Sequence, residues 1–238
     1  MSSTKRGGQR SAADYYPTPA WCVERLLEAV RLPGGVWLEP TAGDGAIVRA
    51  ANASRFRHAL PAVEWHAVEL EARHEPALRS AAGANVRIGS FLDYIPPARI
   101  GIDVVILNPP FRIATDVIER ALSFRPKLVV ALLRLNYLGS ERRADWMRTN
   151  APDVHVLPNR PVFDGRGGDS VEYGWFVWFG GGGTRSAGVV SVLASTPKEQ
   201  RARPGAARSV GINASGEIIC SSRRRASNRR SSSQIEPV

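Results

Sequence analysis

The segment whose residue types best suit chemistry is Asn108–Phe111, with the sequence NPPF, which directly follows the apolar run 102–107. Two consecutive prolines end a strand, and open α/β folds bind ligands at the carboxyl ends of their strands. The Asn108 side chain and the Pro109 carbonyl can accept hydrogen bonds, and Phe111 offers an aromatic face. Such a loop suits a flat heterocycle that bears an amino group. An NPP tripeptide alone is more often an ordinary turn, and the other motifs of the chain reverse that preference.

A second candidate site is the segment Glu39–Gly45, with the sequence EPTAGDG, which lies between an apolar strand and a helix-like run. Gly43 and Gly45 permit a tight turn and a close approach of the backbone to a ligand at a helix N-terminus. Val48 stands where the dinucleotide-binding fingerprint requires its third glycine, so a pyrophosphate-containing cofactor is disfavoured. The loop therefore favours an adenosine ligand without phosphates.

An acidic residue, Glu69, ends the alternating segment 63–69, which follows the glycine loop. An acidic side chain at the end of the second strand of such a fold can accept hydrogen bonds from both hydroxyls of a ribose. A strand-ending glutamate can also be a solvated surface residue, but the position of Glu69 behind the glycine loop favours ribose binding.

These segments together resemble the class I S-adenosylmethionine-dependent amino-methyltransferases, and specifically the DNA adenine-N6 methyltransferases of phages and prophages that carry an NPPF motif. The resemblance covers residues 14 to about 180. It implies S-adenosylmethionine as the cofactor and a catalytic motif consisting of Asn108, Pro109, Pro110 and Phe111. The cofactor-binding residues that it implies are Tyr16, Thr18, Pro19, Glu39, Thr41, Gly43, Gly45, Glu69, Phe91, Asp93 and Asn108.

The resemblance also assigns roles. An amino group conjugated to a purine is a poor nucleophile, because its lone pair is delocalised into the ring. Asn108 Oδ1 and the Pro109 carbonyl would accept its two hydrogens and direct the lone pair at the sulfonium methyl for in-line transfer. Phe111 would stack on the target base after the base has flipped out of the duplex, and Asp93 would bind the cofactor adenine.

Composition predicts a single folded domain, since 238 residues with 43% apolar content can build one sizeable core. Cys22 and Cys220 support neither a disulfide framework nor a zinc site, and the four histidines show no ligand spacing, so no metal is expected. No apolar run reaches membrane-spanning length and no signal-like segment begins the chain. We therefore expect a cytoplasmic protein without a membrane partner.

The formal net charge of +10 is concentrated at the two ends of the chain. Residues 1–13 carry +3 and residues 184–238 carry +7, whereas the methyltransferase-like region 14–183 is neutral. The terminal segments are rich in Ser, Gly and Arg, so we expect disordered basic arms that bind phosphate backbones without reading sequence. A tail of little consequence is the alternative. Within the region 14–183, Arg160 and Arg166 are expected to contact nucleic acid from a glycine-rich loop.

Strand-like and helix-like segments alternate along the chain, which predicts a doubly wound, Rossmann-like α/β fold with a seven-stranded sheet. The expected strands are 36–40, 63–69, 86–90, 102–107, 127–133, 154–157 and 175–179, the last two as an antiparallel pair at the edge. The expected helices are 20–30 and about 45–53, 74–82, 114–123 and 140–149.

DNA is the expected partner, with adenine N6 as the methylated atom. An RNA base (adenine N6 or guanine N2) or a protein glutamine stays open as the substrate, because NPPF suits any planar amino or amide nitrogen. A further alternative is an inactive module that binds the cofactor or nucleic acid. The sequence does not indicate an oligomeric state, and a monomer is compatible with it.

Overall fold

The computed structural model describes residues 16–54, 58, 61–83, 85–163, 170–180 and 188–201, and the backbone of residues 209–212 and 218–221. The chain divides into two compact units, residues 1–204 and 205–238. In the second unit, β9 (Ser209–Ile212) and β10 (Ile218–Ser221) pair antiparallel. The basic arm predicted for residues 1–13 and most of the predicted tail lie outside the described residues.

The elements of the first unit follow the predicted alternation. Its strands are β1 (Gly35–Glu39), β2 (Val63–Glu69), β3 (Val86–Ile88), β4 (Val104–Leu107), β5 (Leu128–Arg134), β6 (Asp153–Leu157), β7 (Tyr173–Phe179) and β8 (Val190–Val192). Its α-helices are α1 (Ala20–Ala29), α2 (Ala46–Ser54), α3 (Glu75–Ala82), α4 (Ala114–Ser123) and α5 (Ala144–Thr149). None of the described helices is long and apolar enough to cross a membrane.

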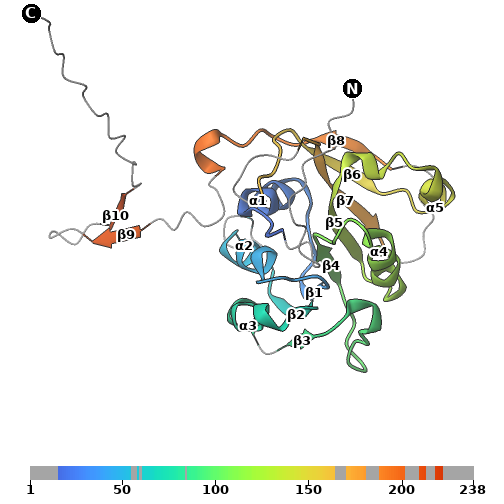
Figure 1. The fold of residues 1–238 in the computed structure, drawn as a ribbon, viewed down its shortest axis with the longest axis horizontal. Helices are drawn as coiled ribbons and strands as arrows, with labels where there is room; N and C mark the ends of the chain where they lie inside the picture. Colours follow the sequence, from blue (N-terminus) through green and yellow to red (C-terminus); the bar gives the residue numbers. More distant parts are fainter. Residues whose placement is uncertain are drawn as a thin grey trace, which may run out of the picture. The chain divides into compact units, whose positions relative to one another are not determined.

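One mixed sheet runs through the first unit in the order β3-β2-β1-β4-β5-β7-β6-β8 (Figure 1). Strand β7 is antiparallel to both β5 and β6, and the other pairs are parallel. The doubly wound prediction is confirmed, but the described sheet has eight strands where seven were expected. The additional strand, β8, pairs with β6 beyond residue 183, where the sequence placed the end of the folded region.

Helices lie on both faces of the sheet (Figure 1), and successive side chains of a strand point to opposite faces. On one face, α1 and α2 pack against Trp37, Val130 and Trp175. On the other face, α4 packs against Leu38 and Val105. The central strands β4 and β5 are buried on both faces, as expected of parallel strands that helices cover on both sides.

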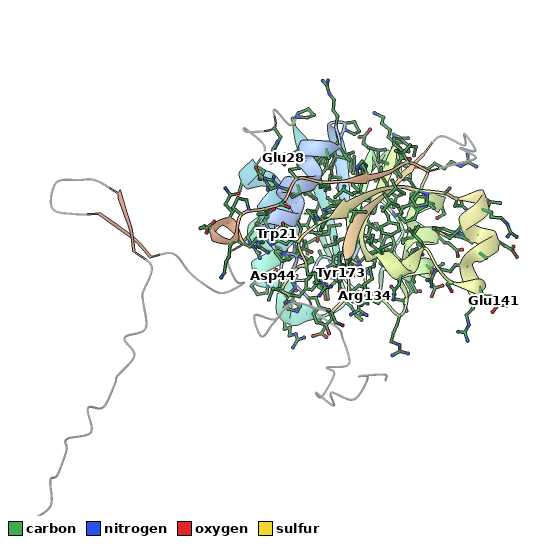
Figure 2. The ribbon with its side chains drawn as sticks, turned by 90° about the horizontal axis from the view of Figure 1, so that it is seen from above. Trp21, Glu28, Asp44, Arg134, Glu141 and Tyr173 are labelled. Atoms are coloured by element: carbon green, nitrogen blue, oxygen red, sulfur yellow. The ribbon has the colours of Figure 1, made fainter. Side chains whose placement is uncertain are left out.

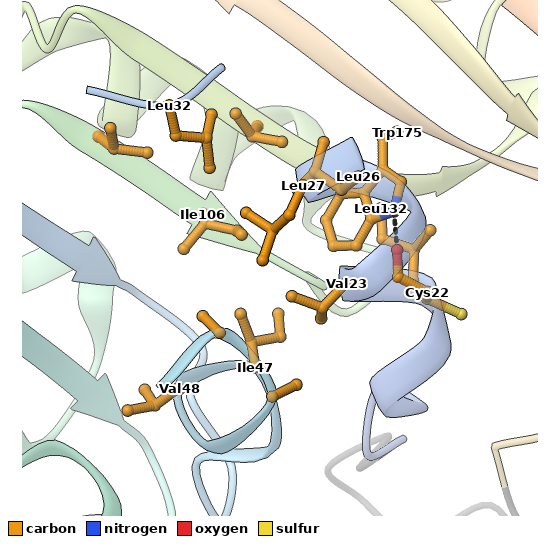
Figure 3. Close-up of a cluster of buried hydrophobic side chains, with 14 of the residues drawn as sticks. Cys22, Val23, Leu26, Leu27, Leu32, Ile47, Val48, Ile106, Leu132 and Trp175 are labelled. Atoms are coloured by element: carbon orange, nitrogen blue, oxygen red, sulfur yellow. Dashed lines mark hydrogen bonds between the residues drawn. The ribbon is translucent and has the colours of Figure 1, made fainter. Parts of the chain in front are cut away.

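Helix α1 is fixed to the sheet near its N-terminus (Figure 3). Val23 and Leu26 are fully buried in the core, and the indole Nε1 of Trp175 on β7 donates a 2.8 Å hydrogen bond to the Cys22 carbonyl. This anchoring matters for function, because the segment that precedes α1 reaches the carboxyl edge of the sheet.

Gly45, at the start of α2, gives a first prediction about stability. Its φ is +84°, and an added Cβ would lie 2.9 Å from Ala81 Cβ and 3.2 Å from Leu78 Cδ1 on α3. We expect Gly45→Ala to lower the free energy of unfolding by about 2–4 kcal/mol, from backbone strain plus overpacking. Urea denaturation measures this change.

Gly83 provides the matched control for Gly45. Its φ is +80°, and an added Cβ would have no heavy atom within 4 Å. Gly83→Ala therefore carries only the backbone cost of placing an alanine at φ +80° and ψ −144°, about 1–3 kcal/mol. Equal losses for the two variants would contradict the claim that α2 and α3 approach closely at Gly45.

Candidate active site

A pocket lies at the carboxyl edge of the sheet, beside the ends of β1, β2, β3 and β4. It contains about 860 Å³ of empty space, part of which is open to solvent. Its lining residues are Tyr16, Pro17, Thr18, Glu39, Pro40, Thr41, Ala42, Gly43, Ala46, Glu69, Leu70, Glu71, His74, Gly89, Ser90, Phe91, Leu92, Asn108, Pro110, Ile113 and Val117.

The charge of the lining limits what the pocket can bind. Three carboxylate residues, Glu39, Glu69 and Glu71, are among the lining residues, and no lysine or arginine is among those the structure describes there. A phosphate group would find no lysine or arginine partner in this lining. The pocket therefore suits a ligand that is neutral or cationic.

The glycine loop and the end of β2 are joined by the Glu69 carboxylate, which is 9% exposed. Oε2 accepts a 2.7 Å hydrogen bond from the Gly43 N–H, and Oε1 accepts a 2.8 Å bond from the Glu71 N–H. Gly43 has a φ of +53° in this turn. Each carboxylate oxygen keeps a second lone pair, so Glu69 can still accept hydrogen bonds from hydroxyl groups of a ligand.

Glu39, at the end of β1, is a buried acid inside the pocket lining. Its side chain is 2% exposed, and Oε2 has no hydrogen-bond partner among the described residues. Burial raises the pKa of the Glu39 carboxyl well above its usual range, and the negative charges of Asp44 and Glu69 act in the same direction. The Val48 N–H and the charge of Arg49 oppose this shift. The unpaired Oε2 of Glu39 is available to bind a cation or a hydrogen-bond donor of a ligand.

The raised pKa of Glu39 predicts a pH-dependent stability. The folded-state pKa of Glu39 lies above the unfolded value of about 4.3. The contribution of neutral Glu39 to the free energy of unfolding is therefore fully present below about pH 4.3, and it is lost as the pH rises and the buried acid ionises. Glu39→Gln stays neutral. We expect Glu39→Gln to raise the melting temperature of the ligand-free protein at pH 8, with a smaller difference at pH 5.

Thermal unfolding at the two pH values checks this prediction about Glu39. The control is Glu199→Gln, at an exposed position, which should change the melting temperature little at either pH. A difference between wild type and Glu39→Gln that does not depend on pH would contradict the assignment of Glu39 as a buried, neutral acid.

Asn108 lies directly after β4, and its amide is held by the segment before α1. Nδ2 donates a 3.0 Å hydrogen bond to the Tyr16 carbonyl and a 3.1 Å bond to Thr18 Oγ1. A carbonyl can only accept, so the nitrogen must be the amide atom that faces Tyr16. Both amide hydrogens are used in this way. Oδ1 has no hydrogen bond to the described residues and is the atom left to accept one from a ligand.

An aromatic cluster borders the pocket on the side of Tyr16. The Phe111 ring stacks with Tyr16 (centroids 6.4 Å apart, 25° between planes) and lies 6.1 Å from the Tyr173 ring. The Phe163 ring makes edge contacts with Tyr16 and Tyr173. The guanidinium carbon of Arg134 lies 4.1 Å from the Phe111 ring centroid, and Arg134 Nε donates to the Tyr173 hydroxyl. Arg134 and Tyr173 are labelled in Figure 2. These rings offer a stacking surface for a planar group.

The structure brings most of the sequence-predicted cofactor residues to one place. Those that line the pocket are Tyr16, Thr18, Glu39, Thr41, Gly43, Glu69, Phe91 and Asn108, with Pro110 from the NPPF motif. Pro109 and Phe111 are not among the lining residues. Neither are Pro19, which precedes α1, and Gly45, which packs against α3.

Asp93, expected to bind an adenine ring, is exposed and does not line the pocket. Asp93 ends a short 3-10 turn. Gly89 and Ser90 are the first two residues after β3, and both line the pocket. Ser90 was not predicted from the sequence. Residues that follow a strand closely lie nearer the carboxyl edge of the sheet than residues further along the loop, and this edge is where open α/β folds bind ligands. Leu70, which follows Glu69 and is 64% exposed, was not predicted either.

Of the two predicted nucleic-acid contacts, Arg160 and Arg166, the structure describes only Arg160. Arg160 forms an ion pair with Glu172, and the pair is about half exposed. Arg166 lies outside the described residues.

A possible metal cluster lies away from the pocket, on α1 and beside the end of α2. Potential ligand atoms of Glu24, Glu28 and His58 all lie within 4.8 Å of one another, although the chain spacing of the histidines gave no sign of it. Glu28 is exposed and pairs with Arg25, and His58 pairs with Glu24.

Comparison with known proteins places the fold. No protein-family model and no curated protein sequence matches the chain. A methyltransferase subunit of a type I restriction-modification system from Streptococcus thermophilus superposes with a TM-score of 0.57 and 16% identity, over 75% of this chain and 47% of the subunit.

Two further solved structures are similar. A protein from Pyrococcus horikoshii assigned as an RNA methyltransferase gives a TM-score of 0.54 and 16% identity, over 76% of this chain and 94% of that one. A modification subunit assigned to a type I restriction enzyme of Vibrio vulnificus gives a TM-score of 0.51 and 13% identity, over 89% of this chain and 60% of that subunit. The fold of this chain is therefore the methyltransferase fold.

Proposed function

We propose that this protein transfers a methyl group from S-adenosylmethionine to the N6 amino group of adenine in DNA. The observation that carries the proposal is the orientation of the Asn108 amide, whose nitrogen is bonded to Tyr16 and Thr18. Its oxygen is thereby left as an acceptor at the carboxyl edge of the sheet, next to Pro109 and the stacking surface around Phe111.

S-adenosylmethionine is the expected cofactor of a protein with this fold, and the described pocket fits it. The cofactor is a nucleoside without phosphates that carries a sulfonium and an ammonium group, so it matches a lining with three acids and no lysine or arginine. Glu69 would bind the ribose hydroxyls. The unpaired Oε2 of Glu39 would face the cationic end, and Leu70 and Phe91 would flank the adenine.

The chain's own residues prepare the acceptor nitrogen. Asn108 Oδ1 and the Pro109 carbonyl accept its two hydrogens, which localises the lone pair on nitrogen. Phe111 stacks on the flipped base, and the residues around the base fix the direction from which its amino group approaches the methyl group. When bound, S-adenosylmethionine would supply a sulfonium-activated methyl group. The amino nitrogen that Asn108 and Pro109 orient would accept this methyl group in exchange for the sulfur and would release its surplus proton to water.

The choice of adenine in DNA as the substrate rests on the resemblance of the NPPF motif to that of DNA adenine-N6 methyltransferases. Two of the similar structures are subunits of restriction systems, which supports a nucleic-acid substrate. Basic segments at both ends of the chain, with +3 and +7, suit a polyanionic partner. Arg112, directly after Phe111, is exposed and makes no hydrogen bond or ion pair with the described residues, so it can meet a phosphate near the flipped base.

RNA is the second candidate substrate. The similar protein assigned as an RNA methyltransferase is covered over 94% of its length by this chain, and the geometry around Asn108 serves an exposed RNA base equally well. The two candidates differ in substrate and share cofactor, site and mechanism.

A labelled-methyl transfer assay tests the proposal. The protein is incubated with methyl-labelled S-adenosylmethionine and, in separate reactions, unmethylated duplex DNA, single-stranded DNA, RNA and cell protein. We expect label in DNA. Label only in RNA would establish the second candidate, label only in protein would point to glutamine, and binding of the cofactor without transfer to any substrate would contradict an enzymatic role.

A further inference from the structure

We propose that Thr18 is a positioning residue that couples occupancy of the cofactor pocket to the orientation of the Asn108 amide. The inference rests on the proposed function, because it assigns a task within the same site. It gives the segment before α1 a role in catalysis in addition to lining the cofactor pocket.

The hydrogen bonds of Thr18 are the first observation. Its side chain is 6% exposed and lines the pocket. Oγ1 accepts the 3.1 Å bond from Asn108 Nδ2, but its own hydroxyl hydrogen has no acceptor among the described residues. A buried hydroxyl hydrogen without an acceptor is costly. Since the lining offers this donor, an acceptor on a bound ligand would satisfy it.

The chemistry of the expected cofactor supplies such an acceptor. The amino-acid end of S-adenosylmethionine carries a carboxylate, and the lining contains no lysine or arginine to bind it. A hydrogen bond from the Thr18 hydroxyl to that carboxylate would polarise Oγ1 and strengthen the bond that Oγ1 accepts from Asn108 Nδ2, because consecutive hydrogen bonds reinforce one another. Cofactor binding would thereby fix Oδ1 in the direction of the acceptor base.

The second contact of the amide explains why Thr18 controls the orientation. The Tyr16 carbonyl binds one amide hydrogen through the backbone, and it permits rotation of the amide about that contact. The Thr18 bond removes this freedom. Without it, the amide is held only by the Tyr16 carbonyl, and its plane can turn while Nδ2 keeps that bond, so that Oδ1 no longer points at the substrate amino group.

The kinetic test compares wild type with Thr18→Val and Thr18→Ser. Valine keeps the shape of threonine and removes the hydroxyl, whereas serine keeps the hydroxyl. We expect Thr18→Val to lower kcat about 10–100-fold, the cost of about 1.4–2.7 kcal/mol in the transition state. The KM for nucleic acid should change much less, the melting temperature should stay close to that of wild type, and Thr18→Ser should recover most of kcat.

Two kinetic outcomes would overturn the inference. If Thr18→Val and Thr18→Ser lose activity equally, the hydroxyl is not the operative group. If Thr18→Val raises only the KM for S-adenosylmethionine and leaves kcat unchanged, Thr18 binds the cofactor without positioning Asn108.

A measurement that needs no turnover separates this inference from the proposed function. The side-chain amide signals of Asn108 are assigned by NMR from their loss in Asn108→Asp and then followed on addition of S-adenosylhomocysteine, which also carries the carboxylate. We expect slower hydrogen exchange of this amide on binding in wild type and not in Thr18→Val. An identical response of both proteins would overturn the coupling. Failure of wild type to transfer methyl groups would overturn only the proposed function.

Discussion

We expect Asn108→Ala to lower the rate of methyl transfer by about 10²–10³-fold or more, the scale on which removal of one preorganised hydrogen-bonding group acts in other active sites. The variant loses Oδ1, which the structure leaves available because both hydrogens on Nδ2 bind Tyr16 and Thr18. The Pro109 carbonyl alone cannot hold the acceptor amino group. Single-turnover transfer rates with saturating cofactor measure the effect directly.

Cofactor binding serves as the internal control for Asn108→Ala. The pocket walls formed by the glycine loop, Glu39 and Glu69 do not depend on the Asn108 side chain, so the calorimetric affinity for S-adenosylhomocysteine should change less than about tenfold. Asn85→Ala, an asparagine in an exposed loop before β3, is the matched variant and should retain full activity. An Asn108→Ala protein that loses cofactor affinity and rate in proportion would refute a role for Asn108 in activating the acceptor.

The second large effect is expected for Glu69→Gln, a change that keeps the shape of the side chain. Both carboxylate oxygens of Glu69 accept backbone N–H groups, from Gly43 and Glu71. An amide has only one oxygen, so its NH₂ group must face one of these donors and leave it unsatisfied in a nearly buried site. The loss of charge also weakens the bonds to ribose hydroxyls. We expect cofactor affinity to fall about 10–100-fold.

Titration calorimetry with S-adenosylhomocysteine measures this affinity. Glu64→Gln is the control on the same strand, since Glu64 is 58% exposed and outside the pocket. It should bind like wild type. If Glu69→Gln also binds like wild type, the ribose assignment and the bridge between the glycine loop and β2 would both be wrong.

The order of the elements followed from the sequence because the hydrophobic patterns are strong. The runs that became β4 and β5 are apolar over their whole length, as buried parallel strands require. Strand β8 was harder to recognise. Its valines are mostly exposed, and only its pairing with β6 places it in the sheet, so a local pattern carries little sign of it.

The candidate site was predictable where a residue directly ends a strand. Glu39, Glu69 and Asn108 each stand at the end of a strand or one position beyond it, and all three line the pocket. Asp93 was a less secure prediction, because the turn between β3 and Asp93 decides which way that residue faces. The contacts of the Asn108 amide with Tyr16 and Thr18 join positions about 90 residues apart, a separation at which sequence patterns give no geometry.

The most direct test of the central claim identifies the methylated atom. Duplex DNA is incubated with the protein and trideuteromethyl S-adenosylmethionine, digested to nucleosides and analysed by mass spectrometry. The account predicts deuterated N6-methyladenine, and none with Asn108→Ala. Deuterium in 5-methylcytosine, or no labelled nucleoside in DNA while RNA or protein carries the label, would contradict it.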